Sequence, residues 1–385
     1  MDFELTPEQS EVRELARGFA DDVLIPSAEE FDRRGEIPPE ILRKMGSLGL
    51  LGLPVPRKWG GVERDTVSYA LGVEEIARGC VSTSVTMAVH ISVCTLPILL
   101  SGTPEQKERL LPRLARGEWI GGFALSEPGS GSDAAALKTS YRDEGDFCIL
   151  NGTKLFVTNG SRGDVVLAFA TKDPTLRSKG ITAFLLERGM KGFVVRGLEK
   201  KMGLRASDTA EIGLEDCVVP KANVLGAAGE GFKVAMSTLE TGRICIGAQG
   251  VGIARAAYDE TLAHLKGRYR KEGTVESFQA QSNQMVDMAM GIDAARLLVM
   301  RAATLKDRGV KPTVEASMAK TFATEHGIEC SRRAIQIVGE PALRSGHRLE
   351  RLYRDAKVTE IYEGTSEIQR LVVANSILKE ATGER

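Results

Sequence analysis

The spacing of apolar residues changes twice along this chain, and that change limits the possible folds more than any other feature. Up to about residue 120, apolar residues recur at helical spacing, as in the run from Val12 to Phe19. Short β-rich runs bounded by Gly, Asp and Lys follow, and helical spacing resumes after Gly231. Because no long helix connects the β-rich runs, we expect antiparallel strands. The sequence therefore predicts an α+β fold with an N-terminal α-helical domain (1–120), a middle antiparallel β domain (121–230) and a C-terminal helical bundle (231–385).

Four short motifs predict where helices begin and where the chain turns. The tetrad TPEQ, at 6–9 and again at 103–106, combines an N-cap threonine, a proline at the first helical position and a glutamine three residues after the cap. SEIQ at 366–369 has the form of a capping box and predicts the start of the last helix. Asn151-Gly152 lies between CIL and KLFV and predicts a hairpin turn.

Charge and hydropathy exclude two classes of partner. The formal net charge is −1, whereas a nucleic-acid binder or a polybasic membrane protein normally has a basic excess. The longest apolar stretch, 84–100, contains Ser, Thr, His and Pro and is shorter than a membrane span, so we interpret it as a buried core helix.

The acidic N-terminus has no basic region followed by an apolar one. We expect a cytoplasmic protein or, if a presequence was removed, one of the mitochondrial matrix.

Cysteine and histidine do not form a metal-binding pattern. The six cysteines are scattered without a Cys-x-x-Cys pair, and no two of the four histidines have the spacing of metal ligands. We expect no metal site and interpret the cysteines as small buried residues of a reducing compartment.

Several stretches could carry chemistry, but none decides its own function. Glu363 lies just before a predicted helix start, where the helix dipole favours an ionised carboxylate that could act as a general base. From position alone, an ordinary solvated acid is the commoner interpretation. The glycine-rich stretch 121–140 could cradle a phosphate or be a surface turn. Arg243, near a predicted helix start, could equally form a structural ion pair.

Seven stretches, in their order and spacing, resemble the acyl-CoA dehydrogenase family along nearly the whole chain. They are ALSEPGSGSD, LFVTNG, KMGLRASDT, LEDCVVPKANVLGAAGEGF, TLETGRI, RLYRDAK and IYEGTSEIQR. The resemblance implies that family's fold, in which a helical domain, an antiparallel β domain and a C-terminal four-helix bundle follow one another.

The resemblance also implies a reaction. Family members bind FAD and oxidise acyl-CoA thioesters to trans-2-enoyl-CoA. By resemblance Glu363 is the base that removes the α-proton, while the β-hydrogen leaves as hydride to flavin N5. The enolate oxygen would be stabilised by the backbone N–H of Glu363 and a ribityl hydroxyl of FAD. Some relatives carry the base just before the arginine of TLETGR, but this chain has Gly242 there, so Glu363 has no rival.

The remaining site residues follow from the same resemblance. The residues implied to bind FAD are Phe123, Leu125, Ser126, Gly131, Ser132, Phe156, Val157, Thr158, Arg268, Gln279, Gln336, Gly339, Thr365 and Glu367. Those implied to contact the acyl-CoA substrate are Ser132, Glu240, Thr241, Gly242, Arg243 and Gly364. Arg268 and Gln279 match residues that reach FAD across a subunit interface.

The chain departs from the family pattern at three places. Phe156 replaces the usual Trp, which keeps a stacking surface but loses the indole donor. Arg270-Lys271-Glu272 replaces Gln-Phe-Gly, and Glu340 replaces a glycine. Because an unpaired carboxylate near a pyrophosphate costs binding free energy, the last two of these changes predict weaker FAD retention than in typical members.

The resemblance further implies a homotetramer that passes electrons to an electron-transferring flavoprotein. Two enzymatic alternatives keep the fold: dehydrogenation of an acyl thioester on a carrier protein, and β-elimination without net oxidation. A non-catalytic flavoprotein is the third alternative, which the retention of Glu363 disfavours. The sequence does not reveal the acyl chain, because pocket depth depends on small offsets between helices.

Overall fold

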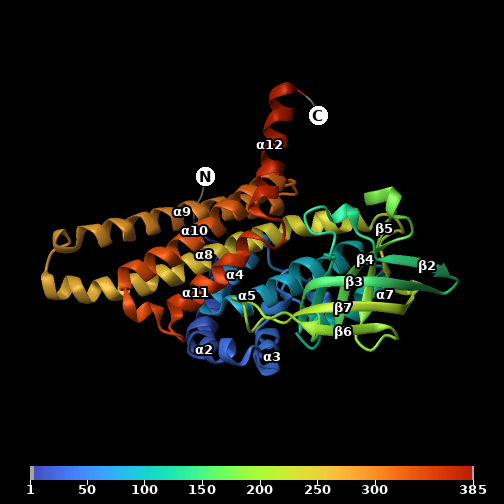
Figure 1. Cartoon of the computed structure of the whole chain (residues 1–385), viewed down its shortest axis with the longest axis horizontal. Coiled ribbons are helices and arrows are strands. Elements are labelled where there is room, and N and C mark those ends of the chain that lie inside the picture. Colours follow the sequence, from blue (N-terminus) through green and yellow to red (C-terminus); the bar gives the residue numbers. More distant parts are fainter. Residues whose placement is uncertain (1–3, 384–385) are drawn as a thin grey trace.

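The computed structural model describes residues 4–383 and consists of a helical part and a β part (Figure 1). The N-terminal helices are α1 (Pro7–Phe19), α2 (Ile25–Arg34), α3 (Pro39–Ser47), α4 (Thr66–Gly79), α5 (Val81–Ala88), α6 (Leu96–Ser101) and α7 (Pro104–Ala115). Helices α1 and α7 begin as predicted: the Thr6 and Thr103 hydroxyls accept from the backbone N–H three residues on, and the glutamine side chains accept from the threonine N–H. Both capping boxes are confirmed.

The apolar stretch near residue 90 forms a helix inside the protein. The segment Val81–Ser101 is long and apolar enough to cross a membrane, but 83% of its most apolar window is buried within the fold. It runs through α5, a π-helical segment at Val89–Thr95, and α6. The interpretation as a buried core helix is confirmed.

The middle of the chain forms one eight-stranded sheet. Its strands are β1 (Gly121–Ala124), β2 (Ser140–Glu144), β3 (Phe147–Thr158), β4 (Val165–Thr171), β5 (Ile181–Glu187), β6 (Phe193–Leu198), β7 (Thr209–Pro220) and β8 (Val224–Leu225). The strand order is β6-β7-β3-β2-β4-β5-β8, with β1 also paired to β4. Most pairings are antiparallel, as predicted, but β1 runs parallel to β4, and β2 pairs β4 in parallel through Ser140 and Thr171. The β2–β3 hairpin lies between β1 and β4 in the chain, which allows that parallel pairing.

The predicted hairpin turn at Asn151-Gly152 is wrong. That dipeptide lies inside β3, and the chain turns instead at Gly145, in the left-handed region at φ 73°. Between Leu150 and Gly152 the register of β3 with β7 shifts, and the Asn151 side chain accepts from the backbone N–H of Asp216 at 2.9 Å. Asn-Gly suits a β-bulge as well as a turn, and the pairing with β7 decided between them.

The C-terminal part is built from α8 (Gly231–Glu272), α9 (Gln279–Asp307), α10 (Thr313–Val338), α11 (Arg348–Ala356) and α12 (Ser366–Thr382). Helices α8, α9 and α10 lie side by side, and α12 extends away from the rest of the molecule (Figure 1). Met288 is fully buried, but Met290 and Leu297 are 60% and 52% exposed, so α9 has a second, uncovered apolar face.

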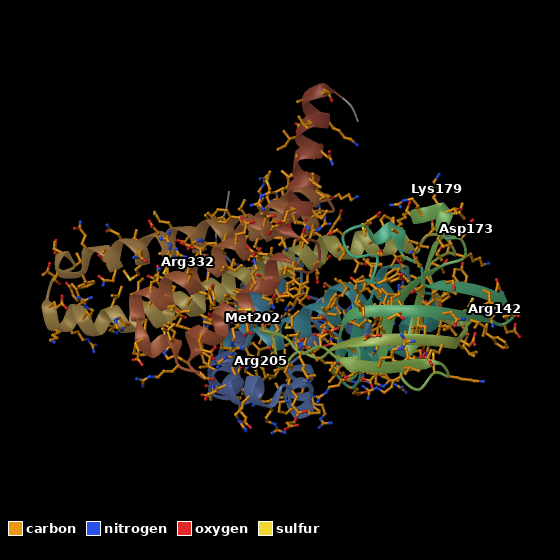
Figure 2. All side chains as sticks on the ribbon, viewed as in Figure 1. Arg142, Asp173, Lys179, Met202, Arg205 and Arg332 are labelled. Atoms are coloured by element: carbon orange, nitrogen blue, oxygen red, sulfur yellow. The ribbon has the colours of Figure 1, made fainter. Side chains whose placement is uncertain are left out.

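The β domain is joined to the helices by the loop between β6 and β7, which includes Met202 and Arg205 (Figure 2). The backbone N–H of Leu204 in this loop donates to the buried Asp355 carboxylate of α11. The last α-helix before the sheet ends at Ala115, and the first α-helix after it begins at Gly231. We therefore propose domain boundaries near residues 120 and 230.

Candidate active site

Glu363 occupies a strained turn between two helical segments. Its φ of 54° lies in the left-handed region, which non-glycine residues seldom adopt, and Gly364 follows at φ 98°. The chain becomes extended at Thr365, whose hydroxyl accepts from the backbone N–H of Ile368 at 3.3 Å and caps α12. The capping box predicted at 366–369 is therefore wrong by one residue, because the cap falls where the left-handed turn ends. The Ser366 hydroxyl is buried without a hydrogen-bond partner among the described residues.

The Glu363 side chain points away from solvent. Both carboxylate oxygens are buried, and neither accepts a hydrogen bond from the part of the chain that the structure describes. Burial raises the pKa of Glu363 to about 7, although Lys320 and Arg243 act electrostatically in the opposite direction. The alternative of an ordinary solvated acid is excluded, and a carboxylate with a pKa near neutrality suits a general base.

Helix α8 forms the wall against which this carboxylate lies. A Cβ atom placed on Gly242 would collide with Oε2 of Glu363, so α8 has a glycine where the carboxylate touches it. The neighbouring Arg243 is buried, its Nε has no partner among residues 4–383, and burial lowers its pKa against the effect of Glu363 and Glu240. Glu240 accepts from the Thr313 hydroxyl at 2.6 Å. The turn and α8 thus place a carboxylate and a guanidinium together, both lacking full hydrogen bonding.

Four polar side chains hold the turn in place. The Tyr362 hydroxyl donates to the Gln249 side chain of α8, and Gln249 donates to the Val81 carbonyl at 3.3 Å. Lys320 of α10 and Gln369 of α12 both donate to the Gly364 carbonyl, at 2.9 and 3.1 Å. The sequence interpretation missed Gln249, Lys320 and Gln369. Lys320 left one signal, a lone lysine among the small residues of SMAKTFA.

A second group of predicted residues gathers where β1 and β3 meet. The register of β3 with β7 shifts between Lys154 and Val157, and within this bulge Phe156 adopts φ 55° with 64% exposure. Leu155 donates to the Ser126 carbonyl at 2.9 Å, which brings the loop after β1 beside the bulge. An uncovered aromatic ring on a strained bulge provides a flat surface for a planar ligand.

The other predicted residues of this region differ in exposure. Phe123 and Thr158 are half-buried, Leu125 and Val157 are buried, and Gly131 and Ser132 are exposed. At Gly131 an added Cβ would meet open space. The loop after β1 therefore offers backbone and hydroxyl groups to a ligand lying over Phe156.

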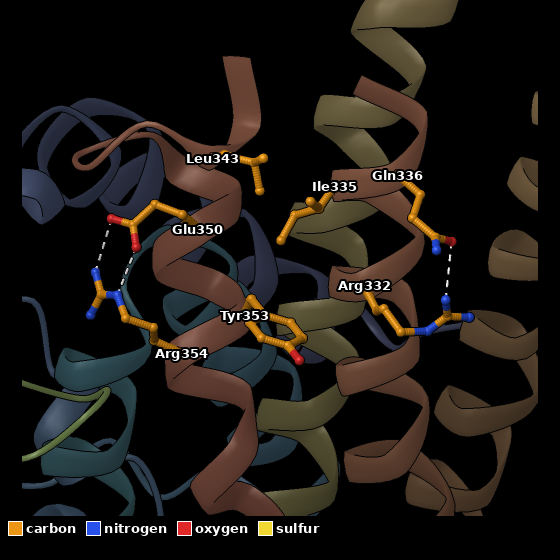
Figure 3. A pocket seen from close by; sticks show the side chains of 7 residues that line it. All are labelled: Arg332, Ile335, Gln336, Leu343, Glu350, Tyr353 and Arg354. Carbon is orange, nitrogen blue, oxygen red and sulfur yellow. Dashed lines mark hydrogen bonds and ion pairs between the residues drawn. The ribbon is translucent and has the colours of Figure 1, made fainter. Parts of the chain in front are cut away.

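The chain does not bring every predicted FAD residue to this place. Arg268 and Gln279 lie at the turn between α8 and α9, at the opposite end of the molecule from the sheet (Figure 1). Gln336 lines a cavity of about 340 Å³ between α10 and α11, with Arg332 and Tyr353 (Figure 3), and Gly339 ends α10. Within one chain, Arg268 and Gln279 therefore lie far from the Phe156 surface.

The two departures expected to weaken FAD retention are both paired. Glu272 accepts from Arg268 at 3.1 Å, and Glu340 accepts from Arg344 at 3.0 Å. The prediction of weaker FAD retention depended on both carboxylates being unpaired, which the structure contradicts. Weaker FAD retention stays a prediction, but without that cause. The Arg268 guanidinium, which was predicted from the sequence to reach FAD, is hydrogen-bonded to Glu272.

All six cysteines are free and buried, as predicted. Within residues 4–383, no group of three or more His, Cys, Asp and Glu side chains is arranged to hold a metal ion.

Models of known families match nearly the whole chain. Those of the N-terminal, middle and C-terminal domains of acyl-CoA dehydrogenase match residues 6–118, 122–217 and 229–378. The chain belongs to the acyl-CoA dehydrogenase family. It is an FAD-dependent oxidoreductase that dehydrogenates acyl-CoA thioesters. The helical, β and helical domains predicted from the sequence are this family's fold.

Three relatives illustrate the similarity. The short-chain specific acyl-CoA dehydrogenase of Clostridium acetobutylicum is 42% identical over 379 residues, covering 98% of this chain and 100% of that protein. The butyryl-CoA dehydrogenase structure from Megasphaera elsdenii is 39% identical, with a TM-score of 0.95 over 98% of this chain and 100% of that one. A chain solved in work on the electron transferring flavoprotein of Acidaminococcus fermentans is 42% identical, with a TM-score of 0.96 and the same coverage.

The residues present fit FAD. The exposed ring of Phe156 offers a stacking surface, and Ser126 and Thr158 offer hydrogen-bonding groups beside it. The 17-residue helix α12 begins directly after the Glu363 turn, and its positive N-terminal end favours a phosphate or an electron-rich ring. The predicted FAD residues of α8, α9 and α10 do not belong to this arrangement.

Proposed function

We propose that this chain oxidises short-chain acyl-CoA thioesters and that Glu363 removes the α-proton of the substrate. The observation that carries the proposal is the carboxylate itself, buried against Gly242 of α8, with neither oxygen accepting a hydrogen bond from residues 4–383. A carboxylate in that state has the basicity and the unoccupied lone pairs that proton removal from carbon requires. The names of the Clostridium and Megasphaera relatives support a short acyl chain.

In the proposed reaction, Glu363 accepts the α-proton as the α C–H bond breaks and its electron pair enters the thioester. The backbone N–H of Glu363 is proposed to donate to the developing enolate oxygen. When bound, FAD supplies a two-electron acceptor for the β-hydrogen. Burial of the Glu363 carboxylate excludes water, which would otherwise lower its basicity and compete for the proton.

We propose that the set of residues expected from the sequence holds the ligands. Phe123, Ser126, Phe156 and Thr158 would contact the flavin, together with the neighbouring Leu125, Gly131, Ser132 and Val157. Thr365 and Glu367, at the start of α12, would lie beside the pyrophosphate region. Ser132, Glu240, Thr241, Gly242, Arg243 and Gly364 would contact the thioester substrate. The observation supporting the substrate set is that Gly242 and Arg243 face the base.

A buried polar pair next to the proposed base, Tyr362 and Gln249, is in keeping with a short acyl chain. Gln249 lies two helical turns along α8 from Gly242, and its side chain is fully buried while it binds the Tyr362 hydroxyl and the Val81 carbonyl. Extending an apolar chain past this pair would break a buried hydrogen-bonded contact, which is costly.

We further propose a homotetramer in which a neighbouring subunit supplies Arg268, Gln279, Gln336 and Gly339 to FAD. Large apolar side chains on α9 and α12 are more than half exposed, and helices with such faces are normally covered by another copy. They are Met290, Leu297, Leu371, Ile377 and Leu378. We also propose an electron-transferring flavoprotein as the acceptor, in keeping with the Acidaminococcus work. The proposed location is the cytoplasm of a bacterium or the mitochondrial matrix.

The test is anaerobic bleaching of the flavin absorbance by a panel of saturated acyl-CoAs of increasing length, for the wild type and E363Q. We expect rapid bleaching by butyryl-CoA in the wild type, slower bleaching by longer chains, and a loss of about 10²–10⁴-fold in E363Q. Bleaching by a carrier-protein thioester but not by free butyryl-CoA would favour the carrier-protein alternative. An E363Q variant as fast as the wild type would reject Glu363 as the base.

A further inference from the structure

Lys320 is a buried cation. It lies on α10, its side chain has no exposed surface, and its ammonium donates to the Gly364 carbonyl at 2.9 Å. Within residues 4–383 no carboxylate forms an ion pair with it. Burying an ammonium with so little compensation costs free energy that a methionine of similar length would not. The charge at this position therefore needs an explanation other than packing.

The backbone that Lys320 binds is the strained turn that carries the base. Glu363 and Gly364 are both left-handed, and the Gly364 carbonyl accepts from two buried side chains, those of Lys320 and Gln369. A non-glycine residue in this conformation costs about 1–3 kcal/mol and persists only when its surroundings fix it. Lys320 ties the turn to α10, the helix that packs most extensively against α8.

Two cations near Glu363 favour the ionised form of its carboxyl group. Lys320 on α10 has the larger influence on the carboxyl, and Arg243 on α8 the smaller. Tyr69 of α4 and Cys245 of α8 also face it, but burial raises the pKa of both, so they stay neutral. The other nearby acids act on the cations: Glu240 on Arg243, and Glu360 and Glu325 on Lys320.

We propose that Lys320 is a positioning residue for proton removal: it fixes the Glu363–Gly364 turn through the Gly364 carbonyl and supplies the buried positive charge that lets Glu363 ionise. This inference rests on the proposed role of Glu363 as the base. Burial lowers the pKa of Lys320 to about 8, partly offset by Glu363, so the ammonium is still largely charged where the base titrates. Lys320 and Glu363 therefore titrate as a coupled pair.

The test compares holoenzymes of the wild type, K320M, K320R and the control K266M, which changes an exposed lysine of α8. The rate constant of flavin reduction by saturating butyryl-CoA is measured against pH. We expect the wild-type rate to rise through about pH 7 as Glu363 ionises. In K320M the rise should move up by about 1–3 pH units, because an opposite charge has been removed, and the plateau should fall. K320R should lie between the two, and K266M should match the wild type.

A second readout does not depend on turnover. The infrared band of the protonated Glu363 carboxyl, assigned by its absence in E363Q, is followed against pH in substrate-free holoenzyme. In K320M we expect the band to persist to higher pH by the same shift. If K320M does not yield folded flavoprotein, K320Q replaces it with the same expectation, because it removes the charge and keeps a donor.

The outcomes separate this inference from the proposed function. An inactive E363Q together with an unshifted pH profile and an unshifted band in K320M would overturn the role of Lys320 alone. An E363Q variant that keeps wild-type reduction would overturn the role of Glu363 and, with it, this inference.

Discussion

Two buried glutamates of this chain both lie against helix α8 and differ in almost everything else. Glu75 of α4 has 1% side-chain exposure and binds Arg255, Arg78 and Arg17 at 2.8 to 3.0 Å. Burial alone would raise the pKa of Glu75, but the three arginines lower it to about 2. The oxygens of Glu363 have no hydrogen-bond partner among the described residues, and its pKa rises to about 7.

Burial acts to raise the pKa of both carboxyl groups, and the presence or absence of hydrogen-bonded arginines decides whether that rise remains. The Glu75 cluster, shared with Glu74 and Arg296, joins α4, α8 and α9, and arginines donate hydrogen bonds to both of its carboxylates. Such a carboxylate stabilises the fold but has no lone pair free for a substrate proton. Glu363 has the reverse properties, which destabilise the fold above neutral pH and suit a base.

Removing the charge of Glu75, the paired glutamate, should have the largest effect on stability. E75Q leaves buried guanidinium groups without full compensation, so we expect the free energy of unfolding to fall by about 3–5 kcal/mol at pH 7. Denaturant unfolding of the holoenzyme measures it. The control is E14Q, in an exposed pair with Arg17, for which we expect less than about 1 kcal/mol. Equal stability of the two variants would show that the cluster does not hold the helices together.

Neutralising Glu363 should raise the free energy of unfolding instead of lowering it. The pKa of Glu363 in the fold is higher than its usual 4.5, so the native state binds more protons between about pH 4.5 and 7 and loses stability as the pH rises through that window. E363Q removes this penalty. We expect it to be more stable than the wild type at pH 8, by up to about 3 kcal/mol, with the difference vanishing below pH 4.5. Denaturant unfolding of both proteins across that pH range tests this expectation. An E363Q variant less stable than the wild type at pH 8 would contradict the raised pKa of Glu363.

Moving the free carboxylate without changing its charge should cost activity. In G242A the new methyl group overlaps Oε2 of Glu363, so the carboxylate has to shift. A displacement of about 1 Å from the reacting carbon costs on the order of 10²-fold in rate, measured as flavin reduction by butyryl-CoA. G267A is the matched control on the same helix, because its Cβ would meet open space. Equal rates in the two variants would mean that Glu363 tolerates displacement.

Breaking exposed ion pairs should have the smallest effect. These pairs are a third kind of carboxylate to set beside Glu75 and Glu363. E272Q should release Arg268 from its partly exposed pair, whereas E340Q breaks a pair that is about 70% exposed on both sides. Surface pairs contribute about 0–1 kcal/mol, so we expect FAD to bind up to about five-fold tighter in E272Q and unchanged in E340Q. Fluorescence titration of apoprotein with FAD measures both constants. Weaker binding in E272Q would show that Arg268 is not being held away from the cofactor.

Local signals in the sequence predicted local structure where one interaction governed it. The caps at Thr6 and Thr103 were predicted correctly because each depends on contacts within four residues. The signal at Asn151-Gly152 failed because β7, more than 50 residues away, chose a bulge over a turn. The cap at Thr365 was displaced from Ser366 because the preceding turn is held from α10 and α12.

The sequence by itself determined the order of helical, β and helical domains and, through its motifs, the family, and it singled out Glu363 as the residue proposed to be the base. Periodicity and short motifs are properties of neighbouring residues, so they survive in the linear chain. Only the tertiary structure decided that the Glu363 carboxylate is buried, that none of the described residues hydrogen-bonds to it, that Gly242 makes room for it, and that Lys320 reaches its turn. Those facts depend on how α8, α10 and the last turn approach one another, because desolvation and charge act through space between residues far apart in the chain.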